Sequence, residues 1–201
     1  MLKIGLTGGI GAGKTTVSDL FAELDPSQKL LAIIDTDIIA RQVVELNKPA
    51  YNKIVKEFGE PVLNDDKTIN RTALAEIIFS DSQAKKILES ITHPAIESAV
   101  KSEITKLEVN YCIIVIPLLF ETRSNYQLDR ILLVEADKDK RVERTIKRDG
   151  SSQKRVALII QSQMPAENKR QYADDIIQNN GNREALQDQV AKLHKLYLNL
   201  A

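Results

Sequence analysis

Cysteine, aromatic residues and net charge are all scarce in this chain, and each scarcity excludes a class of structure or function. The single cysteine, Cys112, cannot form an internal disulfide, and it lies in an apolar run typical of a buried strand. Tryptophan is absent and aromatic residues make up only 4% of the chain, too few to stack single-stranded nucleic acid. Because 28 basic residues balance 28 acidic ones, no net field attracts nucleic acid or an acidic membrane. We therefore expect no nucleic-acid partner.

Long apolar runs are also missing. No stretch approaches the roughly 20 residues of a membrane-spanning helix, and a strand pattern begins at Leu2, which leaves no room for a signal peptide. We expect a cytoplasmic protein with no membrane partner, and we favour a monomer. The 201 residues suit one domain, or one domain with an insertion.

The most specific feature of the sequence is the stretch Gly8–Thr15, which fits the pattern G-x-x-x-x-G-K-[ST] of a phosphate-binding loop. Alternating apolar residues precede it as in a strand. Apolar residues at helical spacing follow it, at Val17, Leu20, Phe21 and Leu24. A glycine-rich loop that opens a helix directs backbone N–H groups at an anion, and the helix dipole favours negative charge there. We therefore expect Gly11, Ala12 and Gly13 to bind nucleotide phosphates.

The two residues that end this motif carry the expected chemistry of a nucleotide triphosphate site. Lys14 is expected to reach the β- and γ-phosphates of ATP, and the hydroxyl of Thr15 is expected to bind Mg²⁺. We also assign Thr16, the next residue of the helix, to nucleotide binding. The sequence thus predicts ATP as a substrate and Mg²⁺ as its metal.

Two carboxylates follow the next buried strand. The apolar run Leu30–Ile34 ends in Asp35-Thr36-Asp37, and open α/β sheets bind their ligands at the carboxyl ends of their strands. Either aspartate could instead cap the helix that follows. A nucleotide-driven motor normally has a metal-binding Asp at the end of a later strand, but Pro117 stands at that place. The role of a carboxylate that serves the metal is therefore assigned to Asp35 and Asp37.

Between Pro49 and Leu107 the pattern is helical throughout, and it is too long for an ordinary crossover between strands. We expect a helical insertion at residues 49–108 that covers the substrate side, with a break at His93-Pro94. The core is then residues 1–48, 109–137 and 171–201, with strands near 111–116, 131–134 and 173–177. Residues 138–170 form a lid.

Three arginines, Arg141, Arg144 and Arg148, are spaced by three and four residues in the expected lid and share one helical face. Such a face is often merely solvated. In a protein with a phosphate-binding loop, guanidinium groups on a mobile lid also stabilise the charge of a transferring phosphoryl group, and we favour that interpretation.

The ordered set of motifs resembles the dephospho-coenzyme A kinase family along nearly the whole chain. The motifs are Leu6-Thr7-Gly8-Gly9-Ile10-Gly11, Gly13-Lys14-Thr15, Asp35-Thr36-Asp37, Ile39-Ala40-Arg41, His93-Pro94, Pro117-Leu118-Leu119, Gln163-Met164-Pro165 and Ala173-Asp174 with Asn179 and Gly181. The family usually has Ala where this chain has Thr36.

The resemblance implies an α/β P-loop kinase fold, in which helices flank a five-stranded parallel sheet that carries a helical coenzyme-binding insertion and a lid. It implies phosphoryl transfer from ATP to the ribose 3′-hydroxyl of dephospho-CoA. Asp37 matches the catalytic aspartate and Arg144 the lid arginine, while Arg148 and Asn179 are assigned to nucleotide binding. Asp35 is expected to hold a Mg²⁺-bound water, although the roles of the two aspartates could be exchanged.

Two other functions fit parts of the sequence. One is a P-loop kinase for nucleoside monophosphates or shikimate, which also pairs a phosphate-binding loop with strand-end carboxylates. The other is a nucleotide-dependent switch or binding module. A GTPase switch needs an Asn-Lys-x-Asp guanine reader, and Asn47-Lys48-Pro49-Ala50 lacks the final acid.

Overall fold

The computed structural model describes residues 1–122 and 126–201. The chain divides into two compact units, the first made of residues 1–35 and 106–201 and the second of residues 36–105. The second unit begins before residue 49, at which the sequence pattern places the start of the insertion. The finer division into core, insertion and lid stays a prediction.

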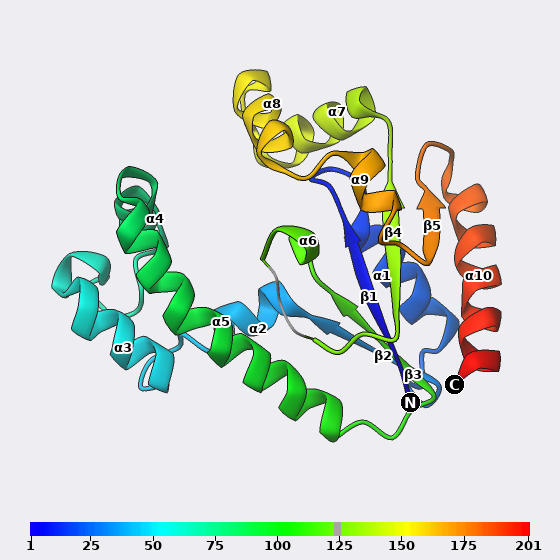
Figure 1. Cartoon of the computed structure of the whole chain (residues 1–201), viewed down its shortest axis with the longest axis horizontal. Helices are drawn as coiled ribbons and strands as arrows, with labels where there is room; N and C mark the ends of the chain where they lie inside the picture. Colours follow the sequence, from blue (N-terminus) through cyan, green and yellow to red (C-terminus); the bar gives the residue numbers. More distant parts are fainter. Residues whose placement is uncertain (123–125) are drawn as a thin grey trace. The chain divides into compact units, whose positions relative to one another are not determined.

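The first unit is built on a five-stranded sheet in which every neighbouring pair is parallel (Figure 1). The strands are β1 (Leu2–Gly8), β2 (Leu31–Asp35), β3 (Tyr111–Val115), β4 (Arg130–Glu135) and β5 (Asp175–Gln178), in the spatial order β2-β3-β1-β4-β5. The predicted α/β fold with a five-stranded parallel sheet is confirmed. β5 begins two residues later than the pattern suggests, a difference within the usual uncertainty of element ends.

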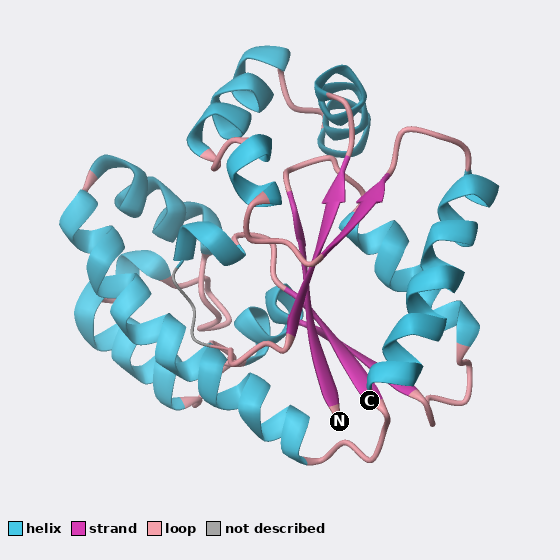
Figure 2. Ribbon diagram, turned by 45° about the vertical axis from the view of Figure 1, so that its right-hand side comes forward, coloured by secondary structure: helices cyan, strands magenta, loops and turns pink. Residues whose placement is uncertain are grey.

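Helices of the first unit flank this sheet (Figure 2). They are α1 (Lys14–Leu24), α6 (Leu119–Thr122), α7 (Lys138–Asp149), α8 (Gln153–Ser162), α9 (Ala166–Arg170) and α10 (Arg183–Leu200). α1 and α10 pack against each other and against the strands, and the rings of Phe21 and Tyr197 stack between them with centroids 6.1 Å apart. Every residue of β3 is buried, as expected for a central strand covered on both faces.

The second unit is helical and has its own small core (Figure 1). It contains α2 (Thr36–Gln42), α3 (Pro49–Phe58), the short 3₁₀ helix η1 (Glu60–Val62), α4 (Arg71–Ser80) and α5 (Ser82–Thr105). Ile54, Val62 and Leu74 form the centre of this core. Within the described residues, no helix of either unit is long and apolar enough to span a bilayer.

The expected break at His93-Pro94 is wrong, because α5 runs through Pro94 without interruption. Proline removes one backbone N–H and crowds the preceding turn, which usually ends or kinks a helix. Here α2, α3 and α4 all pack against α5, and these tertiary contacts favour one continuous helix. The local sequence rule fails because packing supplies more stability than the lost hydrogen bond.

Candidate phosphate-binding and phosphoryl-transfer site

The loop after β1 has the geometry of an anion cradle. Gly13, the residue before α1, has a left-handed backbone with φ of 96°, a conformation that costs glycine nothing. Its carbonyl accepts the first helical hydrogen bond, 3.0 Å from the Val17 nitrogen, and it has no side chain to cap the first turn. The N–H groups that open α1 are therefore not used within the helix, and a phosphate oxygen could accept hydrogen bonds from them.

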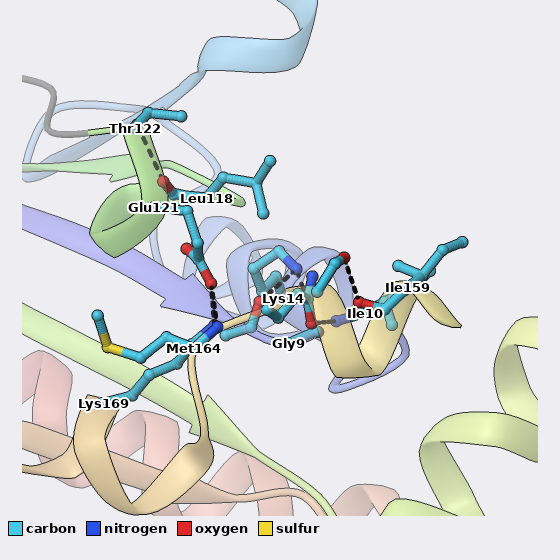
Figure 3. Close-up of polar contacts among 12 residues, drawn as sticks. Gly9, Ile10, Lys14, Leu118, Glu121, Thr122, Ile159, Met164 and Lys169 are labelled. Carbon is cyan, nitrogen blue, oxygen red and sulfur yellow. Dashed lines mark hydrogen bonds and ion pairs between the residues drawn. The ribbon is translucent and has the colours of Figure 1, made fainter. Parts of the chain in front are cut away.

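Lys14 is folded back over the first half of this loop. Its Nζ lies 2.9 Å from the Gly8 carbonyl oxygen and 3.3 Å from that of Gly9, and it donates to both (Figure 3). Thr15, the next residue, is exposed at the start of α1. The expected phosphate-contacting lysine thus lies on the loop itself.

Asn179 is a buried brace beneath the loop. Its Nδ2 donates to the Ala12 carbonyl at 2.8 Å, and its backbone N–H donates to the Glu135 carbonyl at 2.7 Å. A Cβ at Gly13 would overlap this Asn179 amide, so glycine is required there for close approach as well as for backbone conformation. The structure therefore shows Asn179 supporting the loop backbone; direct contact with nucleotide stays a prediction.

Arg144 approaches the site through the same residue. Its Nη2 donates to the Asn179 carbonyl at 3.0 Å, while its Nη1 is buried with no hydrogen-bond partner among the described residues. Arg148 behaves differently, because its exposed guanidinium pairs with the adjacent Asp149 at 2.6 Å. Thus Arg144 is directed to the braced loop and Arg148 is not.

Arg141 makes the direct contact between α7 and the phosphate-binding loop. Its Nε donates to the Ile10 carbonyl at 2.9 Å, and its guanidinium lies so close to Gly9 that a Cβ there would overlap it. Gln163 completes the contact, since its Oε1 accepts from the Ile10 N–H at 3.1 Å and from Arg141 Nη2 at 3.4 Å. Sequence reasoning gave Arg141 only the shared role of the arginine face in stabilising phosphoryl charge, predicted no contact with the loop, and quoted Gln163 only as part of a motif.

The two aspartates stand where β2 ends. Asp35 is the last residue of β2 and is in register with Val115, which in turn is in register with Leu6 of β1. Asp35 is therefore at the same sheet edge as the phosphate-binding loop. Asp37 follows in the first turn of α2, in the second unit, and is exposed.

Glu121 and Lys169 form a charged pair that sequence reasoning missed. Glu121 Oε1 lies 2.9 Å from Lys169 Nζ and also accepts from the Met164 backbone N–H at 3.0 Å (Figure 3). Its Oε2 is buried without a hydrogen-bond partner among the described residues. The pair joins α6, directly after β3, to α9. No local pattern signals it, because the two residues are far apart in the sequence.

A cavity of about 130 Å³ adjoins the first half of the phosphate-binding loop. Its walls include Gly9, Ala12, Glu135, Arg141, Gln163 and Arg170. Glu135 is already neutralised, because Arg170 Nε donates to its two carboxylate oxygens at 2.8 and 3.0 Å and Gln178 adds a third bond at 2.7 Å. Two cations that line the cavity, Lys169 and Arg170, are paired with Glu121 and Glu135, whereas Arg141 has no carboxylate partner among the described residues.

Metal ligands are sparse. Nowhere in the described part of the chain do three or more His, Cys, Asp or Glu side chains gather as a metal cluster. Mg²⁺ in phosphoryl-transfer sites is usually held by only one or two protein oxygens, together with substrate phosphates and water. The hydroxyl of Thr15 and the carboxylate of Asp35 are oxygen donors of that kind.

Comparison with known proteins agrees with this geometry. A model of the family "Dephospho-CoA kinase" matches residues 2–185. The dephospho-CoA kinase of Acinetobacter baylyi is 40% identical over 99% of this chain and 100% of its own length. That of Coxiella burnetii is 41% identical over 100% of this chain and 99% of its own length.

Solved structures share the fold of this chain. A Thermus thermophilus protein, TT1252, superposes with a TM-score of 0.82 at 34% identity and covers 97% of both chains. A dephospho-CoA kinase from Campylobacter jejuni has a TM-score of 0.70 at 28% identity over 98% of this chain and 97% of its own. Shikimate kinase from Acinetobacter baumannii, at 17% identity over 100% of this chain and 94% of its own and a TM-score of 0.53, shares the fold alone. With its fold, its phosphate-binding loop and its full-length relatives in agreement, the chain belongs to the dephospho-CoA kinase family, a family of kinases.

Proposed function

We propose that this chain transfers the γ-phosphoryl group of ATP to the ribose 3′-hydroxyl of dephospho-CoA, which yields coenzyme A and ADP. The observation that carries the proposal is the phosphate-binding loop, with Lys14 folded over it and Asn179 bracing it, in a chain that matches the family over its full length. The family match supports dephospho-CoA, rather than another alcohol, as the acceptor.

The residues divide the work of transfer. The N–H groups of residues 11–16 bind the phosphate oxygens, and the ammonium of Lys14 offsets the charge on the β- and γ-phosphates as the bond to the leaving group breaks. A ribose hydroxyl is a weak nucleophile. We assign Asp37 to orient it and to accept its proton as the phosphoryl group arrives.

Mg²⁺, when bound, neutralises charge on the β- and γ-phosphate oxygens. We propose that the Thr15 hydroxyl is its protein ligand and that Asp35 holds a water in its coordination shell. The oxygen character of both side chains and the place of Asp35 at the loop's edge of the sheet support this assignment. The alternative, in which Asp35 is the base and Asp37 serves the metal, has the same donor chemistry.

Arg144 is proposed to stabilise the transition state from the lid. Its buried, unpartnered Nη1 supports this role, because a buried N–H without an acceptor is costly and a nucleotide oxygen would satisfy it. Nucleotide binding by Arg148 stays a prediction. Its exposed pair with Asp149 is equally typical of an arginine that faces solvent.

A substrate profile tests the proposed function. The purified chain is incubated with ATP and Mg²⁺ and, separately, dephospho-CoA, nucleoside monophosphates or shikimate, and the products are identified by mass spectrometry. We expect one phosphate on the 3′-oxygen of dephospho-CoA, with at most trace turnover of the other acceptors. Preferred phosphorylation of a nucleotide or of shikimate would refute the proposal, and acceptor-independent binding without transfer would identify a binding module. We further propose that the monomer is active, which sedimentation at assay concentration checks.

A further inference from the structure

We propose that Arg141 binds the terminal phosphoryl group of ATP by exchanging its hydrogen bonds to the Ile10 carbonyl and to Gln163 for hydrogen bonds to phosphate oxygens; the proposal rests on the proposed function only in taking ATP as the phosphoryl donor. The exchange is a simple one. Arg141 releases neutral oxygens of the protein and takes charged oxygens of the ligand.

The electrostatics of Arg141 favour such an exchange. Its described hydrogen-bond acceptors, the Ile10 carbonyl and the Gln163 amide oxygen, carry no net charge. Burial also lowers the pKa of the guanidinium, which shows that the charged form is poorly compensated where it lies. The charge of the neighbouring Glu135 opposes this shift, and its carboxylate is hydrogen-bonded to Arg170 and Gln178 and not to Arg141.

The position of Arg141 favours the terminal phosphoryl group over the rest of the nucleotide. Its guanidinium lies against Gly9 and Ile10, the first half of the loop. Lys14, which reaches the β- and γ-phosphates in phosphate-binding loops, lies on the carbonyls of Gly8 and Gly9. The two cations therefore donate hydrogen bonds to the carbonyls of consecutive residues, Gly9 and Ile10. Arg144, in contrast, is bonded at the end of β5 through Asn179.

Gln163 explains how the resting contact avoids competing with the ligand. A carboxylate at this position would pair with Arg141 and would have to be displaced by phosphate. The neutral amide oxygen holds the guanidinium weakly, at 3.4 Å, and keeps the Ile10 N–H satisfied at 3.1 Å when the arginine leaves. The substitution Gln163→Glu is therefore a second, independent perturbation of the same exchange.

Calorimetric titration of ATP and ADP tests the proposal without using turnover. Arg141→Gln is expected to raise the Kd of ATP about tenfold to a hundredfold, the loss of charge-assisted hydrogen bonds, while the Kd of ADP changes less than threefold. Gln163→Glu keeps Arg141 but places a competing negative charge beside it, so this variant too should weaken the binding of ATP more than that of ADP. Arg155→Gln removes an exposed arginine of α8 and should change neither value.

Three results would overturn the proposal: an unchanged ATP affinity in Arg141→Gln, an equal loss for ATP and ADP, or a Gln163→Glu chain that binds ATP as well as the parent. Melting temperatures identify a variant that has lost its fold, and Arg141→Lys then replaces Arg141→Gln. Because no acceptor is present, an error in the assigned acceptor would leave these binding results intact, so failure of this inference and failure of the proposed function are separate outcomes.

Discussion

The ammonium of Lys169 lies 2.9 Å from a carboxylate oxygen of Glu121, and only 3% of the lysine side chain is exposed. The same oxygen accepts the Met164 N–H at 3.0 Å. A single carboxylate thus fixes two points of the segment that ends α8 and begins α9. Gln163, the residue before Met164, bonds to the phosphate-binding loop. The charged pair therefore holds the segment beside Gln163, the residue that contacts the loop.

Glu121→Gln is expected to lower the free energy of unfolding by about 3 kcal/mol, the low end for breaking a buried ion pair, because the carboxylate side chain is partly exposed. The cost arises because Lys169 is left charged and buried. Urea denaturation of Glu121→Gln, Lys169→Met and the double variant measures it. The double variant should recover at least half of the loss. A single variant that loses less than about 1 kcal/mol would contradict the buried-pair interpretation.

Lys14→Ala is expected to abolish transfer while the chain stays folded. In the proposed mechanism the lysine is a fixed positive charge beside the β- and γ-phosphates, which alanine cannot supply. Its two described bonds to loop carbonyls are too few to hold the fold together. Steady-state kinetics and a melting curve are the measurements. Near-normal turnover would remove the phosphate-binding loop from the mechanism.

Asp37→Asn separates catalysis from helix capping. Asp37 lies in the first turn of α2, where asparagine keeps the hydrogen-bonding oxygen and loses only a helix-dipole contribution of about 0.3–1 kcal/mol, so stability should change little. A general base, in contrast, cannot lose its charge. Turnover should fall by roughly 10² to 10⁴, the usual contribution of a positioned base, with ATP affinity nearly unchanged. Full activity in this variant would exclude the base assignment.

Asp35→Asn should show a different defect. If this carboxylate orients a Mg²⁺-bound water, the variant should require more Mg²⁺ and recover turnover at high concentration. We would measure kcat across a Mg²⁺ titration for both aspartate variants. An Asp37 variant rescued by Mg²⁺ beside an unrescued Asp35 variant would show that the two roles are reversed.

Arg144→Ala is expected to lower kcat by about 10³, the low end for an arginine that meets transition-state charge, with a much smaller change in dephospho-CoA binding. A fall in kcat without a matching rise in Kd would distinguish Arg144→Ala from Arg141→Gln, whose main expected effect is a weaker affinity for ATP. If kcat is unchanged, Arg144 serves only to bond the Asn179 carbonyl.

The stability of the fold should fall as the pH is lowered through the ordinary histidine pKa of about 6.5, in part because of His194. Burial lowers the pKa of this imidazole from its ordinary value of 6.5, and Asp25 opposes the shift only in part. The unfolded chain therefore binds the proton more readily, and acidification favours unfolding. His194 Nδ1 lies 2.7 Å from the Tyr111 hydroxyl. Denaturation of the parent and His194→Gln at several pH values should show a flatter pH dependence in the variant; equal slopes would exclude His194.

Local patterns predicted the buried strands and the phosphate-binding loop, whereas the five-stranded parallel sheet was predicted from the resemblance to a known family. The strand, loop and helix around Gly8–Thr15 follow one another directly in the sequence, so one continuous motif predicts all three. The buried parallel strands are likewise continuous apolar runs. Such features depend on neighbours in the sequence, which is why one sequence suffices to predict them.

What could not be predicted depends on contacts between distant segments. The bond from Gln163 to Ile10 and the pair of Glu121 with Lys169 each join elements that the sequence separates widely. Pro94 is a related case, because its local signal for a helix break is overridden by the helices packed on α5. Sequence spacing identified the arginine face of α7, but only the structure shows that Arg141 rather than Arg148 contacts the loop.

Cys112 gives this chain an intrinsic reporter. It is the only thiol, it is fully buried in β3 between β1 and β2, and burial raises its pKa to about 11. A thiol reagent in solution can therefore react only when the middle of the sheet opens. The labelling rate of the unmodified protein measures the frequency of that opening, and the factor by which ATP slows the labelling gives the stabilisation of the folded state by the ligand.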